Sequence, residues 1–147
     1  MIESTIAPAE SLRGLCGGRV FLPGDPGYDA ARTPWNVAVQ QLPAAVAVPT
    51  SAEEVAEVVR AAAAAGLRVA PQSTGHNPGP LAGRLENTVL LRLSDFTGVS
   101  VDPERRTARV LGGTVWQDVV EAAAAHGLAV MHGSSPDVGV AGFTLGG

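Results

Sequence analysis

Two short loops carry the residues of this chain whose types and spacing could bind or activate a ligand. Residues 73–77 read STGHN, and residues 133–137 read GSSPD. In turns of this kind, consecutive backbone N–H groups form a concavity that binds anions without help from lysine or arginine. One such loop alone would be interpreted as an ordinary surface turn. Two of them indicate a site that closes on a phosphate-bearing ligand from both sides.

The two loops follow two units of similar sequence. Residues 58–69 read VVRAAAAAGLRV, and residues 119–130 read VVEAAAAHGLAV. In each unit an alanine-rich helix is predicted to end at a glycine, Gly66 or Gly127, and to continue into a strand. Ligands of open α/β sheets bind at the loops that follow strands. The repeat therefore predicts that both loops converge on one ligand.

The first half of the chain predicts a strand–helix–strand unit. Residues 45–48 indicate a buried strand, and Ser51 with Glu54 forms a capping box that opens the following helix. Residues 67–70 then return as a strand. Such a crossover is expected to be right-handed, with parallel strands. Ahead of this unit we expect two short elements, a helix over residues 1–15 and an edge strand over residues 20–22.

The second half predicts a hairpin and a second helix. An Asp-Pro turn at residues 102–105 joins two antiparallel strands. Thr114 and Gln117 form a second capping box, which opens a helix running to about His126. The strands of this half are predicted at residues 88–93, 99–101, 107–111 and 128–131. The expected class is α/β, or α+β with a mixed sheet whose strand order no motif specifies.

Composition excludes several functional classes. With 147 residues, 46% hydrophobic and 16% charged, the chain can bury the core of one folded domain. Its net charge of −4 argues against a broad nucleic-acid surface. No apolar run reaches the roughly 18 residues of a membrane span, and no signal peptide is evident. The single cysteine, Cys16, excludes an internal disulfide and makes a cysteine-built metal site unexpected. A cytoplasmic protein with no metal is the simplest expectation.

The glycines near the end of the chain separate this pattern from two common nucleotide-binding motifs. Residues 138–142 read VGVAG, an alternation that suggests backbone held close against a flat or extended ligand. No lysine follows the glycines, so the pattern is not a P-loop, and the Rossmann spacing is absent from the first unit. Residues 138–147 carry no charge, which is unusual for a solvated end. We therefore expect the chain to be a fragment.

Five segments in the expected order resemble the FAD-binding domain of the vanillyl-alcohol-oxidase/PCMH flavoproteins, and most closely the FAD-linked oxidases related to berberine bridge enzyme. They are PGDPGY at 23–28, WN at 35–36, QSTGHN at 72–77, VSVDP at 99–103 and VGVAGFTLGG at 138–147. The resemblance implies a PCMH-type α+β fold, with a small βαβ subdomain beside a mixed-sheet subdomain, truncated at its C-terminal end. It implies an N-terminal segment of residues 1–37 and an incomplete FAD-binding domain of residues 38–147, without a substrate domain.

The resemblance also implies a cofactor site for FAD. In that family a loop ending in Gly-His wraps the diphosphate, and its histidine often bonds covalently to the 8α-methyl group of the flavin; His76 is the matching position. The implied cofactor-binding residues are Gln72, Ser73, Thr74, Gly75, His76, Asn77, Gly133, Ser134, Ser135, Val138, Gly139, Gly142, Thr144 and Gly146.

Two departures from the family pattern affect this site. The family loop usually has arginine followed by glycines, whereas PQST stands at residues 71–74, so the diphosphate would depend more on hydroxyl groups. Members with two covalent links carry a cysteine where this chain has Ser135. At most one covalent bond to FAD, through His76, is therefore expected.

The function implied by the resemblance is the FAD-binding part of a flavin-dependent oxidoreductase. Such an enzyme oxidises a small organic substrate by hydride transfer to flavin N5, with oxygen as the expected acceptor. The catalytic base is expected in a domain that this chain lacks. The alternatives are a non-catalytic nucleotide-binding module, a decayed fragment of such an enzyme, or a purely structural α/β domain. No motif specifies the substrate, the choice between oxidase and dehydrogenase, or the oligomeric state.

Overall fold

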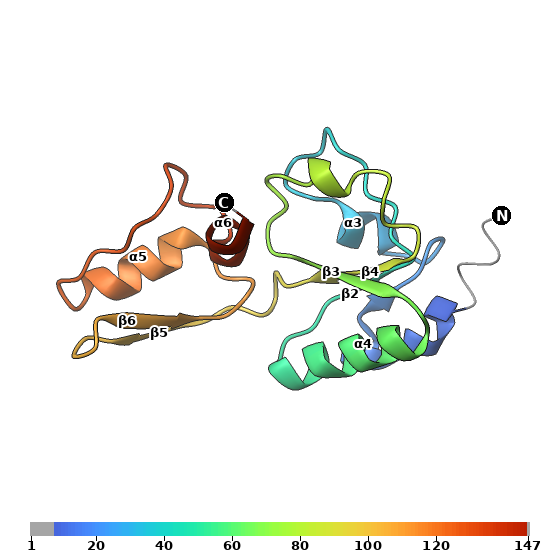
Figure 1. The fold of residues 1–147 in the computed structure, drawn as a ribbon, viewed down its shortest axis with the longest axis horizontal. Coiled ribbons are helices and arrows are strands. Elements are labelled where there is room, and N and C mark those ends of the chain that lie inside the picture. Colours follow the sequence, from blue (N-terminus) through green and yellow to red (C-terminus); the bar gives the residue numbers. More distant parts are fainter. Residues whose placement is uncertain (1–7, 147) are drawn as a thin grey trace.

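The chain forms two lobes that lie side by side (Figure 1). The computed structural model describes residues 8–146. The first lobe contains a four-stranded sheet covered by helix α4 (Ala52–Ala64) on one face and helix α3 (Tyr28–Arg32) on the other. The second lobe contains the hairpin of β5 and β6 together with helices α5 and α6. No helix within residues 8–146 is long and apolar enough to cross a membrane.

The sheet of the first lobe is mixed, with strand order β1-β2-β4-β3. Strand β1 (Val20–Phe21) pairs antiparallel with β2 (Ala45–Ala47) and forms one edge. Strand β4 (Thr88–Arg92) runs parallel to β2 on one side and to β3 (Arg68–Gln72) on the other. The predicted edge strand and the predicted parallel crossover β2–α4–β3 are therefore confirmed. The crossover skips one position in the sheet, which β4 fills.

Local sequence determines where α4 begins and ends. The Ser51 hydroxyl accepts the N–H of Glu54 at 3.2 Å, as an N-cap should. The Glu54 carboxylate accepts the N–H of Thr50 at 2.7 Å, so it completes the capping box one residue before the predicted position. Gly66 then adopts a left-handed φ of 70°, which ends the helix.

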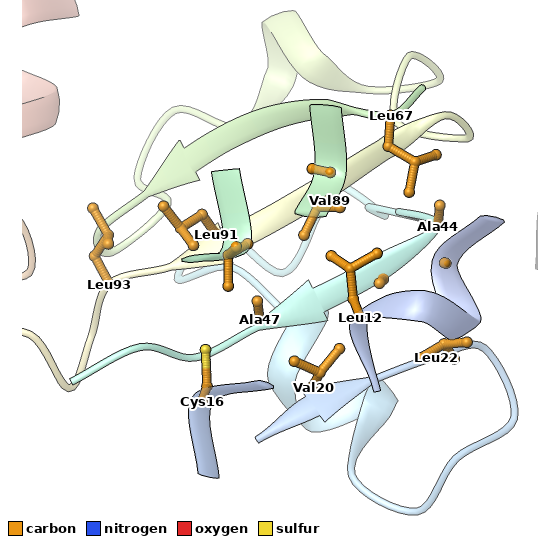
Figure 2. Packing of buried hydrophobic residues seen from close by; sticks show 14 residues of the cluster. Leu12, Cys16, Val20, Leu22, Ala44, Ala47, Leu67, Val89, Leu91 and Leu93 are labelled. Atoms are coloured by element: carbon orange, nitrogen blue, oxygen red, sulfur yellow. The ribbon is translucent and has the colours of Figure 1, made fainter. Parts of the chain in front are cut away.

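Both faces of the sheet are buried, because successive side chains of a strand point to opposite sides. In β2, Ala45 and Ala47 join the core on the α4 side, whereas Val46 joins the core beside α3. Figure 2 shows the α4-side core, in which Leu12 and Cys16 from the N-terminal segment pack against the sheet. Residues 8–37 therefore share a core with the segment that follows them. The boundary between residues 37 and 38 stays a prediction.

The helix predicted over residues 1–15 does not run through in the part that the structure describes: residues 8–9 are helical, and residues 1–7 lie outside the described part. Instead, the 3-10 turn η1 (Glu10–Leu12) is followed by α2 (Leu15–Gly18). Gly14 between them has φ of 93°, a left-handed conformation that cannot continue a right-handed helix. Short elements complete the lobe: η2 (Gly79–Leu81) follows the first loop.

In the second lobe the predicted hairpin is confirmed. Strand β5 (Val99–Asp102) pairs antiparallel with β6 (Thr107–Val110). The Asp102 carboxylate accepts the N–H groups of residues 104 and 105 at 3.1 and 3.0 Å, which closes the turn. Helix α5 (Trp116–Ala124) packs on this hairpin through Trp116 and Val119.

The second capping box, however, is wrong. The N-cap of α5 is Val115, and no side chain caps the helix. The hydroxyl of Thr114 instead accepts the N–H of Gly98 at 2.9 Å and donates to its carbonyl at 3.2 Å. Gln117 donates to Glu121 at 2.9 Å. Because Thr114 is fully buried, its hydroxyl ties two backbone segments together and is unavailable to the helix.

The strand predicted over residues 128–131 does not form, and Met131 is 94% exposed. Residues 127–130 instead line one side of a hollow of about 400 Å³, and Val101 and residues 106–108 of the hairpin line the other. A strand needs the backbone groups of a neighbour. Within the described chain no strand pairs with this segment.

Candidate cofactor-binding site

The two predicted loops meet in a cleft between the lobes. This cleft has a volume of about 680 Å³ and is lined by residues 71–78 of the first loop and by residues 138, 139, 141–143, 145 and 146 after the second. A Cβ atom on Gly139 would overlap Ser73 Oγ and lie 2.7 Å from Ser73 Cβ. Only glycine allows this approach. The loops therefore touch each other through backbone and a hydroxyl group.

Backbone hydrogen bonds hold the second segment in place. The carbonyl of Thr114 accepts the N–H of Val140 at 3.0 Å, and the N–H of Trp116 donates to the carbonyl of Val138 at 3.0 Å. Residues 115 and 139 form an isolated antiparallel bridge. The start of α5 thus fixes Gly139 against the first loop.

The first loop follows β3 and is braced from outside by the N-terminal segment. Gly75 has φ of 78°, and a Cβ atom there would lie 2.7 Å from Pro34 Cβ. The carbonyl of Thr74 accepts the N–H of Trp35 at 2.9 Å, and the carbonyl of Gly75 accepts the N–H of Asn36 at 3.2 Å. Residues 34–36 therefore pack along the outside of the first loop and are hydrogen-bonded to its backbone.

His76 has one nitrogen in a hydrogen bond and one without a partner. Nδ1 lies 2.7 Å from the Thr74 hydroxyl oxygen. Nε2 is buried with no hydrogen-bond partner among the described residues, and the nearest carboxylate oxygen, Asp137 Oδ2, is 3.7 Å away. The imidazole stacks on the Trp35 ring, with centroids 4.1 Å apart and planes 15° from parallel.

Ser73 adds a second polar atom without a partner. Its hydroxyl oxygen is buried and forms no hydrogen bond within residues 8–146. Buried polar groups in folded proteins are nearly always hydrogen-bonded. Ser73 Oγ and His76 Nε2 are therefore two unpaired polar atoms on the same loop of a glycine-rich cleft. A polar ligand bound there would supply their missing hydrogen bonds. The residues present therefore fit a dinucleotide held by its diphosphate.

Arg92, which no sequence motif singled out, supports the first loop from the neighbouring strand β4. Arg92, the last residue of β4, is the register partner of Gln72 and donates to its side-chain oxygen at 2.9 Å. Burial lowers the pKa of Arg92. No carboxylate of residues 8–146 pairs with it. The signal in the sequence was a single charge ending an apolar strand.

The structure brings together most, but not all, of the predicted site residues. Those that line the cleft are Gln72, Ser73, Thr74, Gly75, His76, Asn77, Val138, Gly139, Gly142 and Gly146. Gly133, Ser134, Ser135 and Thr144 do not line it; Gly133 packs against the Phe143 ring, and the other three are exposed. Those four assignments stay predictions.

The segment after the second loop forms α6 (Val140–Gly146), a short helix that the alternation of valine and glycine did not predict. Val140 packs on Trp116, and Phe143 meets the Trp116 ring edge-on at 5.5 Å. The cleft wall on this side is therefore a helix rather than extended backbone. Trp116 belongs to the core of the second lobe.

Several known proteins are similar to this chain in sequence and in architecture. A family model described as FAD binding domain matches residues 43–147. The (R)-6-hydroxynicotine oxidase of Paenarthrobacter nicotinovorans is 36% identical over 130 residues, which are 88% of this chain and 28% of that protein. Glucooligosaccharide oxidase of Sarocladium strictum is 33% identical over 123 residues, 82% of this chain and 24% of that protein. The solved structure of BBE-like 1 from Physcomitrella patens matches 99% of this chain and 30% of its own, with a TM-score of 0.76 at 24% identity, and shares the fold.

The chain belongs to the FAD-binding domain family of the vanillyl-alcohol-oxidase/PCMH flavoproteins. The predicted family, fold class and cofactor, FAD, are confirmed. The chain spans only 28% and 24% of the length of the two curated relatives.

Proposed function

We propose that this chain is the FAD-binding part of a flavin-dependent oxidoreductase that oxidises a small organic substrate. The observation that carries the proposal is the contact of Gly139 with Ser73, which closes two glycine-rich loops on one cleft in a member of the FAD-binding domain family. When bound, FAD would supply the redox chemistry by accepting a hydride at flavin N5, with oxygen as the expected final acceptor.

The residues of this chain would hold the diphosphate and orient the flavin. Backbone N–H groups of residues 73–77 form the anion-binding turn, and the free Ser73 hydroxyl adds a donor. Gly139 leaves room for the ligand backbone to approach. Arg92 adds positive charge through the Gln72 carboxamide, although it does not line the cleft itself. This arrangement replaces the arginine that the family loop usually carries.

His76 is our candidate for covalent attachment to FAD. Its unpaired Nε2 lies in the cleft wall, and its ring is held by Thr74 and Trp35. A bond from Nε2 to the 8α carbon would replace one C–H bond and the proton on Nδ1, and the two protons and two electrons released would pass to oxygen, giving hydrogen peroxide. Since Ser135 cannot form a thioether, one covalent bond is the maximum.

The remaining assignments follow from the resemblance. We assign no catalytic base to this chain. We expect the base in a region that corresponds to the part of the relatives outside the match. Two oxidases similar in sequence, named for 6-hydroxynicotine and for glucooligosaccharides, support a small organic molecule as substrate. A cytoplasmic location stays a prediction from the sequence, as does the absence of nucleic-acid and membrane partners.

Titration of the chain with FAD, followed by flavin fluorescence, tests the proposal. Gly139→Ala should weaken FAD binding about 30-fold, because overpacking this contact costs about 2 kcal/mol. Gly79→Ala is the matched control, since a Cβ atom there meets only Asn77 Oδ1 at 3.9 Å and Gly79 does not line the cleft. Adding Ser73→Gly to Gly139→Ala should restore room between the loops. Failure of the unmodified chain to bind FAD would overturn the proposal.

A further inference from the structure

We propose that Trp35 is a positioning residue for His76: its indole holds the imidazole ring in the orientation from which Nε2 meets bound flavin. This inference rests on the proposed function and on the covalent assignment of His76. It assigns a role in the cofactor site to a residue that lies before the segment matched by the family model, residues 43–147.

The stacked geometry carries the inference. The two rings lie at a centroid distance of 4.1 Å with planes 15° apart, so the indole covers one face of the imidazole. Such a contact restricts rotation of the His76 ring about its terminal side-chain torsion, which is otherwise broad. The Thr74 hydroxyl at 2.7 Å from Nδ1 removes the remaining twofold choice between the two ring orientations.

The bond to Thr74 engages Nδ1, so Nε2 is the nitrogen available to react with flavin. When Nδ1–H donates to the Thr74 oxygen, Nε2 carries the free lone pair that a nucleophile needs. Nε2 has no partner among the described residues, and the nearest oxygen of the second loop, on Asp137, is 3.7 Å away. The atom therefore faces the side on which the two loops meet.

Backbone hydrogen bonds, rather than packing of the indole in the core, hold Trp35 beside His76. Its N–H donates to the Thr74 carbonyl at 2.9 Å, and the neighbouring N–H of Asn36 donates to the Gly75 carbonyl at 3.2 Å. Its side chain is nevertheless 60% exposed. An indole that leaves most of its surface in water contributes little to the core. The contact that its position secures is the one with His76.

The experiment compares the rate of covalent attachment with the strength of reversible binding. The chain without flavin is mixed with FAD, and acid-precipitated flavin is measured over time, while fluorescence titration gives the dissociation constant. We expect Trp35→Ala to slow attachment about tenfold, because a misoriented nucleophile loses rate steeply. The dissociation constant should change less than about threefold. Trp35→Phe keeps an aromatic face and should restore attachment to within about twofold.

Val37→Ala is the matched control, because Val37 is an exposed apolar residue of the same segment and lies outside the cleft. It should change neither quantity. Equal attachment rates in Trp35→Ala and the unmodified chain would overturn the inference, as would parallel losses of attachment and reversible binding. If the unmodified chain binds FAD reversibly but never attaches it, the inference and the covalent assignment both fail while FAD binding stands. If it binds no FAD, the proposed function itself fails.

Discussion

The two repeated units begin alike and end differently. In both, an alanine-rich helix forms and ends at a glycine with nearly the same left-handed conformation, φ of 70° at Gly66 and 68° at Gly127. After Gly66 the chain enters β3 and pairs with all five residues of β4. After Gly127 residues 128–131 stay outside any sheet of the described chain. The helix and its end are local properties, whereas the strand requires a partner.

The starts of the helices teach the same lesson. The hydroxyl of Ser51 caps α4 by accepting the N–H of Glu54. Thr114 has a similar position in sequence before α5, but its hydroxyl is buried and bonded to Gly98. A side chain that the pattern assigns to a helix thus bonds instead to the backbone just before β5 once the lobe folds.

Substitution of the equivalent strand positions should give the largest difference between the units. Ala70 is buried in β3, whereas the residue 61 positions later, Met131, is 94% exposed. We expect Ala70→Asp to lower the free energy of unfolding by about 3 kcal/mol or more, because it buries an unpaired carboxylate. Met131→Asp should change it by less than about 0.5 kcal/mol. Urea denaturation followed by circular dichroism measures both, and similar losses would contradict the comparison.

Removing the hydroxyl groups of Thr114 and Ser51, one at a time, compares the stability contributed by a buried hydrogen bond with that contributed by a helix cap. Thr114→Val should cost about 2 kcal/mol, since it leaves the half-buried N–H and C=O of Gly98 without the Thr114 hydroxyl. Ser51→Ala should cost about 1 kcal/mol through loss of the N-cap. Both values come from urea unfolding. If Thr114→Val proves as mild as a surface substitution, the bond to Gly98 is not what stabilises this lobe.

The two glycines that end the helices should respond equally. No atom lies within 4 Å of a Cβ added at Gly66 or Gly127, so the cost of Gly→Ala is that of the left-handed backbone alone. We expect about 1 kcal/mol at each position, measured as a shift of the thermal midpoint. Gly79→Ala, where φ is not positive, serves as the reference. Unequal costs at the two glycines would show that the helix ends are not equivalent.

The smallest expected effect is a pH dependence at the start of α4. The N–H of Thr50 lowers the pKa of the Glu54 carboxyl from 4.5, with Arg19 adding to the effect. Because the native pKa is below the unfolded one, this stabilisation is fully present above about pH 4.5 and is lost as the pH falls through the native pKa. The stability difference between the unmodified chain and Glu54→Gln should therefore shrink below pH 4.5. A difference that is constant across that range would contradict the assignment.

Much of the first lobe could be predicted because its signals are local. The cap at Ser51, the glycine at residue 66 and the apolar stretch that becomes β4 each act within a few residues, as the Asp102 turn does in the second lobe. The cleft that the first loop lines is completed by the segment after the second loop, residues 138–146, rather than by residues 133–137 of the loop itself. The helix predicted at the N-terminus failed because the left-handed Gly14 interrupts it.

Contacts between segments distant in sequence could not be predicted in the same way. The stack of Trp35 on His76 and the bond from Arg92 to Gln72 join residues 41 and 20 positions apart. Neither pair has a spacing rule, because no single helix or strand contains both partners. The bond from Arg92 became visible only when β4 lay beside β3, and the stack only when the backbone of Trp35 paired with the first loop.

By itself, then, the sequence determined where α4 begins and ends, which stretches are apolar, and which two loops carry glycine and hydroxyl groups. The tertiary structure alone decided which strands find partners, which hydroxyl group caps a helix, and which aromatic ring fixes His76. The physical reason is that turns and caps satisfy backbone groups within one segment. Strands, buried hydroxyl groups and stacked rings need atoms that only the folded chain brings near.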